Sequence, residues 1–163
     1  MAGRKLIEEA LPIWSTAPQN WTSAASTGDY ISMKGYQSVM FIIQTGAWAA
    51  GTAAVTVNEA TDVGATGAQA LTFLEYWTNS ATAASANMVR TVCASTFNII
   101  NQANTLYAIE ITADTLTTNT NYDCISLAIA TPGANADFYS AVALGFRTRY
   151  QRDTATMIDA IAD

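Results

Sequence analysis

The sequence predicts an all-β protein, an antiparallel β-sandwich of about eight strands. Bulky apolar residues alternate with small or polar ones, most clearly within Thr105–Ala113 and Tyr122–Ala130. Glycine, proline and asparagine fall between the alternating segments, as turns between short strands require. Charged residues make up only 12% of the chain. This pattern favours a sandwich or barrel over alternating strands and helices.

The predicted strands follow one another from Asp29 to Tyr150. In chain order they are Tyr30–Lys34, Gln37–Gln44, Thr52–Glu59, Gln69–Trp77, Met88–Ile100, Thr105–Ala113, Tyr122–Ala130 and Phe138–Tyr150. Strands of this number and length fit a jelly roll, and an immunoglobulin-like sandwich is the alternative. The order in which the strands are connected within each sheet is not visible in the sequence.

The chain divides into an extended N-terminal arm (1–28), a β-sandwich domain (29–150) and a short C-terminal tail (151–163). A chain of 163 residues and 17.3 kDa is long enough to bury one substantial core. The tail has a capping residue followed by an apolar face, so we expect a short helix there. Such a helix is too short to persist alone and needs a surface on which to dock.

The arm holds two tryptophans in a polar, loop-like context. Its first part, Arg4–Leu11, predicts a short helix, and the prolines that follow are expected to prevent regular structure. An isolated arm would leave Trp14 and Trp21 in water. Either the arm packs back across its own domain, or it reaches a neighbouring molecule with the tryptophans as anchors.

Net charge and targeting signals restrict the partners. A net charge of −6 and a pI of about 4.4 argue against nucleic-acid binding, which needs clustered Lys and Arg. Arg147 and Arg149 project to the same side of a predicted strand, so they are candidate contacts to a partner's carboxylates; a solvated strand end is the alternative. Glu8 and Glu9 interrupt the N-terminal segment, which therefore does not resemble a signal peptide. The longest bulky apolar run, Val39–Ile43, is far too short to cross a membrane. We expect the protein to be made and kept in a cytoplasm.

The two cysteines, Cys93 and Cys124, fall on separate predicted strands without CxxC spacing. No histidine exists to complete a metal site or to activate a thiol. In a cytoplasmic protein we expect two buried free thiols rather than a disulfide.

The residue inventory argues against an enzyme. Without histidine, Ser-His-Asp triads, Cys-His pairs and His-based metal sites are excluded. Glu59 and Asp62 lie close together in the sequence, but the pattern of a calcium loop is absent, so a solvated turn is the expected structure. Glu110, Asp114 and Asp123 are expected at strand ends or on outward faces, where they do not form a glycosidase pair. No catalytic residue, cofactor or metal is predicted.

Aromatic residues leave one binding function open. A flat platform for a sugar would need several exposed rings in one plane, and a carbohydrate-binding module is therefore an alternative. The candidate rings are Tyr76, Trp77, Tyr107, Tyr122 and Phe138. In a sandwich with few bulky aliphatic residues, such rings also serve as core and interface packing.

Four segments carry a family resemblance, namely Asp29–Val57, Ala70–Phe73, Leu106–Leu116 and Tyr122–Leu144. With SMKGYQSVMFIIQTGAWAAGTAAVTV, ALTF, LYAIEITADTL and YDCISLAIATPGANADFYSAVAL, the chain resembles small β-sandwich proteins encoded among the head genes of tailed bacteriophages. Members of that group are capsid decoration, or cement, proteins. The resemblance rests on the strand pattern and on the sequences of these segments, and it includes no catalytic motif.

The resemblance implies a structural virion protein that decorates the outer capsid surface and stabilises it by bridging capsomers. It further implies the major capsid protein as partner, a homo-oligomer with a trimer favoured, and a virion location after assembly in the host cytoplasm. The candidate capsid or inter-subunit contacts are Trp14, Trp21, Arg147 and Arg149. Other phage structural components (tail tube, head completion or fibre base) remain alternatives.

Overall fold

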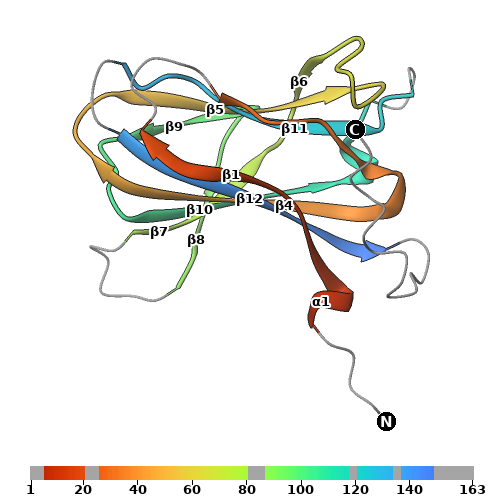
Figure 1. The fold of residues 1–163 in the computed structure, drawn as a ribbon, viewed down its shortest axis with the longest axis horizontal. Helices are drawn as coiled ribbons and strands as arrows, with labels where there is room; N and C mark the ends of the chain where they lie inside the picture. Colours follow the sequence, from red (N-terminus) through yellow and green to blue (C-terminus); the bar gives the residue numbers. More distant parts are fainter. Residues whose placement is uncertain (1–5, 21–25, 81–86, 118–120, 134–136, 149–163) are drawn as a thin grey trace.

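The protein is a β-sandwich in which two antiparallel sheets pack face to face (Figure 1). This confirms the fold class predicted from the sequence. The computed structural model describes residues 6–20, 26–80, 87–117, 121–133 and 137–148. Every strand pair in the described residues is antiparallel.

Sheet A has six strands, and the first and last strands of the chain lie side by side within it. In spatial order they are β1 (Ala10–Asn20), β12 (Asp137–Thr148), β4 (Tyr36–Trp48), β10 (Thr105–Thr112), β7 (Glu75–Ser80) and β8 (Val89–Val92). A four-residue helix, α1 (Leu6–Glu9), precedes β1. In Figure 1 this sheet forms the lower layer, with α1 below it at one end.

Sheet B also has six strands, but they form only four rows across the sheet. Two of the rows each consist of two short strands that follow one another along the same neighbour. β11 (Cys124–Ile129) and β5 (Thr52–Ala60) form its centre. Two short strands, β2 (Ser26–Thr27) and β3 (Ile31–Ser32), line the free side of β11, and β6 (Gln69–Leu71) and β9 (Thr96–Ile100) line the free side of β5. Two short 3₁₀ turns, η1 (Met33–Gly35) and η2 (Ala113–Thr115), complete the described elements.

Two predicted strands each prove to be two strands in different sheets. The predicted strand Gln69–Trp77 contains β6 of sheet B and β7 of sheet A, and Met88–Ile100 contains β8 of sheet A and β9 of sheet B. The two segments that cross between the sheets lie side by side. The N–H of Cys93 in the second crossing donates to the carbonyl of Leu74 in the first at 2.9 Å. Neither crossing contains glycine or proline; Ser95 adopts a left-handed backbone with φ of 72° instead. The sequence therefore carried no break signal at these points.

The N-terminal arm predicted for residues 1–28 was wrong over β1, and so was the expectation that prolines prevent regular structure there. β1 pairs with β12 along its length, with register shifts between Pro12 and Trp14 and between Thr16 and Gln19. Proline has no N–H to donate, so it is tolerated on an edge strand and at bulges, and β1 is such an edge strand. The predicted helix Arg4–Leu11 is also shortened, because β1 already begins at Ala10. The predicted C-terminal helix lies outside the described residues.

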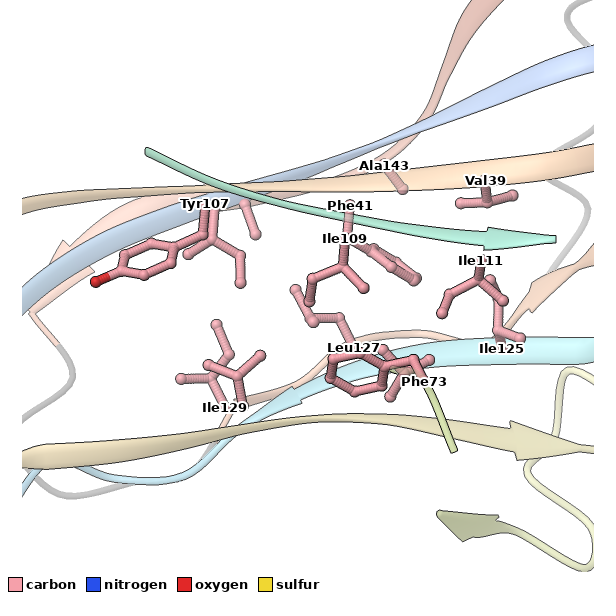
Figure 2. Close-up of a cluster of buried hydrophobic side chains, with 14 of the residues drawn as sticks. Val39, Phe41, Phe73, Tyr107, Ile109, Ile111, Ile125, Leu127, Ile129 and Ala143 are labelled. Atoms are coloured by element: carbon pink, nitrogen blue, oxygen red, sulfur yellow. The ribbon is translucent and has the colours of Figure 1, made fainter. Parts of the chain in front are cut away.

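The core fills the space between the sheets, and Figure 2 shows side chains from both layers meeting there. The inward residues alternate along β4, β10 and β11, as the sequence predicted for the last two strands. The labelled residues are Val39, Phe41, Phe73, Tyr107, Ile109, Ile111, Ile125, Leu127, Ile129 and Ala143, all 5% exposed or less. Burying a side chain of this size is worth about 1.5–3 kcal/mol, so this layer dominates the stability of the sandwich.

Deletion of β1 tests whether the N-terminal segment belongs to the folded body. Removing residues 1–25 is expected to lower the thermal unfolding midpoint markedly, because β12 loses its β1 hydrogen bonds and becomes an exposed edge. Removing residues 1–9 takes away α1 but keeps β1, and is expected to leave the midpoint within a few degrees of full length. Melting followed by circular dichroism measures both; equal midpoints for the longer deletion and the full chain would contradict the account.

Candidate functional site

Of the four contact residues predicted from the sequence, only Trp14 has a described side chain. Arg147 lies near the end of β12, but its side chain is outside the described part. Trp21 and Arg149 lie outside the described residues altogether. The structure therefore does not bring these four residues together, and Trp14 is the one whose role it can assign.

Trp14 packs against its own domain. Its ring meets Phe41 edge to face, with centroids 6.4 Å apart and planes at 81°. On the other side, a Cβ built on Gly28 would lie 2.5 Å from Trp14 Cζ2, so the absence of a side chain at Gly28 makes room for the indole. Gly28 is itself held to sheet B, since its N–H donates to the Leu127 carbonyl at 2.8 Å. Trp14 thus ties the edge of sheet A to sheet B, which is the self-packing alternative weighed for the arm.

The buried carboxylate of Glu59 is a hydrogen-bond acceptor for the protein. Glu59 is 1% exposed at the end of β5. Its Oε1 accepts from Gln69 Nε2 at 2.6 Å and from the Thr117 hydroxyl at 2.5 Å, while Oε2 accepts from the Thr117 N–H at 2.9 Å. These donors occupy the oxygens that a cation would need. Glu59 fixes the segment after η2 onto sheet B.

The remaining carboxylates do not converge on a common point. Asp62 forms a tight turn, in which its Oδ1 accepts from Thr66 N–H at 3.0 Å, and this hydrogen bond lowers the pKa of Asp62. Asp123 pairs with Lys34 Nζ at 2.9 Å beside sheet B, whereas Glu110 is exposed on sheet A. Among the described residues no group of three or more His, Cys, Asp or Glu is placed to hold a metal ion.

Both cysteines are free thiols, which confirms the prediction against a disulfide, but only Cys124 is buried and Cys93 is partly exposed. Cys124 is 2% exposed, and burial, reinforced by the Cys124 Sγ–H bond to Asp123 Oδ1 at 3.0 Å, raises its pKa to about 12. Burial also raises the pKa of Cys93. Because the thiolate is the reactive form, neither thiol is activated as a nucleophile at neutral pH.

The predicted aromatic residues do not form one platform. Tyr76 and Tyr107 stack on Phe97 inside the sandwich, with centroids 3.9 Å and 5.5 Å from the Phe97 ring. Trp77 follows Tyr76 on β7 and therefore projects to the opposite face of sheet A. The hydroxyl of Tyr122 donates to the Gly67 carbonyl at 2.9 Å. These four rings lie on different faces, so they offer no common plane for a sugar; the fifth candidate, Phe138, is exposed at the start of β12.

Replacement of Glu59 by Gln tests the role of the buried carboxylate. One oxygen becomes an NH₂ group facing donors from Gln69 or Thr117, so we expect a loss of about 1–3 kcal/mol in the free energy of unfolding. Asp62→Asn in the exposed turn is the matched control, with an expected change within about 0.5 kcal/mol. Urea unfolding measures both variants. An unchanged midpoint for Glu59→Gln, or a rise in wild-type stability on adding calcium, would show that the carboxylate has another function.

Two further observations concern membrane spans and known proteins. Within the described ranges no helix is long and apolar enough to span a membrane. Comparisons with protein-family models, with curated proteins and with solved structures find no match to this chain. The function is therefore inferred from the fold, the residue inventory and the surface of the protein itself.

Proposed function

We propose that this chain is a structural virion protein that decorates the outer surface of a tailed-phage capsid and stabilises it by bridging capsomers. The observation that carries the proposal is the order of the strands. Counting β2 with β3 and β6 with β9 as single rows, and setting aside the β7–β8 hairpin, leaves eight rows. Numbered in chain order, the eight rows are β1, β2 with β3, β4, β5, β6 with β9, β10, β11 and β12. Across sheet A the rows then lie in the order 1, 8, 3 and 6, and across sheet B in the order 2, 7, 4 and 5. We infer that the sandwich is a jelly roll, the arrangement of two interlocked Greek keys.

Jelly rolls occur in viral capsid proteins, lectins and cupins, so the residue inventory must distinguish between these classes. A metal-dependent enzyme on this fold would ordinarily use histidine ligands, and the chain has none. A lectin would present its aromatic rings together, whereas Tyr76 and Tyr107 pack inside and Trp77 lies on the outer face. A viral structural protein needs neither histidine ligands nor a group of exposed aromatic rings.

The physical properties of the body suit a decoration protein. Its two sheets are joined through a continuous core and tied at the open edge by Trp14, which gives a rigid block. Such a block stabilises a shell by adding buried contacts between neighbouring capsomers. Its partner in this role is the major capsid protein, its own state is a homo-oligomer with a trimer favoured, and its place is the virion surface after assembly in the host cytoplasm.

The attachment residues proposed from the sequence are no longer equally good candidates for capsid contact. Trp14 is engaged within the sandwich and is a poor anchor for the capsid. Arg147 follows Phe146 near the end of β12, and Arg149 comes two positions later in the sequence. These arginines and Trp21 remain the proposed capsid contacts, because carboxylates on a capsid would pair with the guanidinium groups.

Particles of the virus that encodes this sequence provide the test. Immunogold electron microscopy with an antibody to the chain is expected to label the outer surface of intact heads. Heads assembled without the protein are expected to open at a lower temperature than complete heads, and adding the purified protein should restore the difference. Label on tails or fibres would favour another virion component, and absence from particles together with binding on a glycan array would favour a carbohydrate-binding module.

A further inference from the structure

The centre of the outer face of sheet A is apolar, although it faces away from the core. β4 is apolar on both sides: Phe41 and Ile43 point inward, and Met40 and Ile42 lie on the outer face, partly exposed. A strand that is apolar on both faces is characteristic of a sheet covered on both faces. The Val39–Ile43 run was visible in the sequence, but its outward members could not be assigned to a surface without the register.

The register assembles the outward residues of several strands into rows. Ile42 lies opposite Val142 of β12 on one side and Ala108 of β10 on the other, and Ala108 lies opposite Trp77 of β7. In the next row, Met40 lies opposite Leu144. All of these side chains are partly exposed. We call the set Met40, Ile42, Trp77, Ala108, Val142 and Leu144 the outer apolar patch.

Sheet B shows what a solvent-facing surface of this protein looks like. Its outward residues on β5, β9 and β11 are small or polar, with Ile100 the one large apolar exception among those described. The exposed or partly exposed ones include Thr52, Thr56, Asn58, Thr96, Asn98 and Ala128, whereas Cys124 and Ser126 of β11 are buried. The two outer faces of one sandwich thus differ in kind. Solvent exposure explains the outer face of sheet B and does not explain the outer apolar patch.

No described strand or helix lies across the outer apolar patch; α1 lies beyond sheet A at one end of it (Figure 1). Charge is sparse on this face. Among its described residues, Glu75 and Arg90 pair with each other at the β7–β8 rim, and Glu110 is exposed opposite Met40. Two copies of an acidic chain would therefore meet here with little like-charge repulsion, as in the charge-depleted centre of protein interfaces.

The size of the face distinguishes the possible occupants. Six strands about 4.8 Å apart and on average about nine residues long give a face of roughly 850 Å² in projection. Stable protein interfaces bury about 800 Å² on each partner. Even a fully helical segment as long as residues 149–163 would cover only about 220 Å², since it would be about 22 Å long and 10 Å wide. A folded partner fits the face, and a short segment of chain does not.

We propose that a second copy of this chain covers the outer face of sheet A, with the outer apolar patch at the centre of the interface. A flat, weakly charged apolar surface is complementary to itself, and a copy is the partner that presents the same surface. Such a contact is two-fold and joins copies in pairs, so the inferred assembly is a dimer and departs from the trimer favoured above. The proposal concerns contacts between copies and does not depend on the role of the chain in a virion.

Ile42→Glu tests the proposal, because Ile42 lies at the centre of the patch and not in the core. Asn98→Glu places the same new charge on the outer face of sheet B and is the matched control. Light scattering coupled to size exclusion is expected to give wild type and Asn98→Glu a common mass of at least twice 17.3 kDa. Ile42→Glu is expected to elute near 17.3 kDa with an unchanged circular dichroism spectrum.

Ala108→Glu, on the neighbouring strand, serves as the second variant if Ile42→Glu does not fold. A wild-type monomer at every concentration would overturn the proposal, as would a patch variant that keeps the wild-type mass. If the wild type is monomeric and deletion of residues 149–163 makes it associate, the tail occupies the face instead. If the monomeric wild type binds capsids and Ile42→Glu does not, the occupant is the capsid protein; both results contradict a second copy.

Discussion

The rest of the structure depends on the insertion of β12 between β1 and β4. β12 pairs with β4 from Asp137 to Thr148 and with β1 over nearly the same length, so the last described strand joins the edge strand β1 to the rest of sheet A. The pairing requires close approach: a Cβ added to Gly145 would lie 2.5 Å from the buried ring of Tyr36. Until β12 is in place, β4 lacks one neighbour and β1 has no strand with which to pair. The sandwich therefore closes only when its two ends meet.

The sequence was most informative where each strand lies in one sheet and alternates throughout. β10 followed its predicted alternation because local period-two patterning decides which side chains enter the core. In β11 the predicted inward residues are in the core, but Cys124 and Ser126 on the opposite face are buried as well. The prediction of strand boundaries failed at the two crossings after Leu71 and Val92. There the apolar alternation continues in the sequence while the chain changes sheets. The prediction also failed at β1, because a proline is compatible with a strand only at an edge or a bulge, and edge position depends on the whole topology.

The contact sites were less predictable than the fold, because their partners are distant in sequence. Glu59 resembled a surface turn residue next to Asp62, yet its carboxylate is buried against Thr117, 58 residues away. Nothing in the sequence indicated that Trp14 packs over Gly28, where the absence of a side chain makes room for the indole. The outer apolar patch was signalled only by the apolar run in β4; the residues from β7, β10 and β12 that extend it are brought together by register.

A sandwich whose two outer faces differ in this way suits the assembly role that we propose. An electron cryo-microscopy reconstruction of the intact particle, at a resolution that separates strands, tests it most directly. The account predicts the jelly roll on the outer shell, with the outer apolar patch buried against another copy and the Thr-rich face of sheet B in solvent. A sandwich with the patch exposed to solvent, or a shell without this protein, would contradict it.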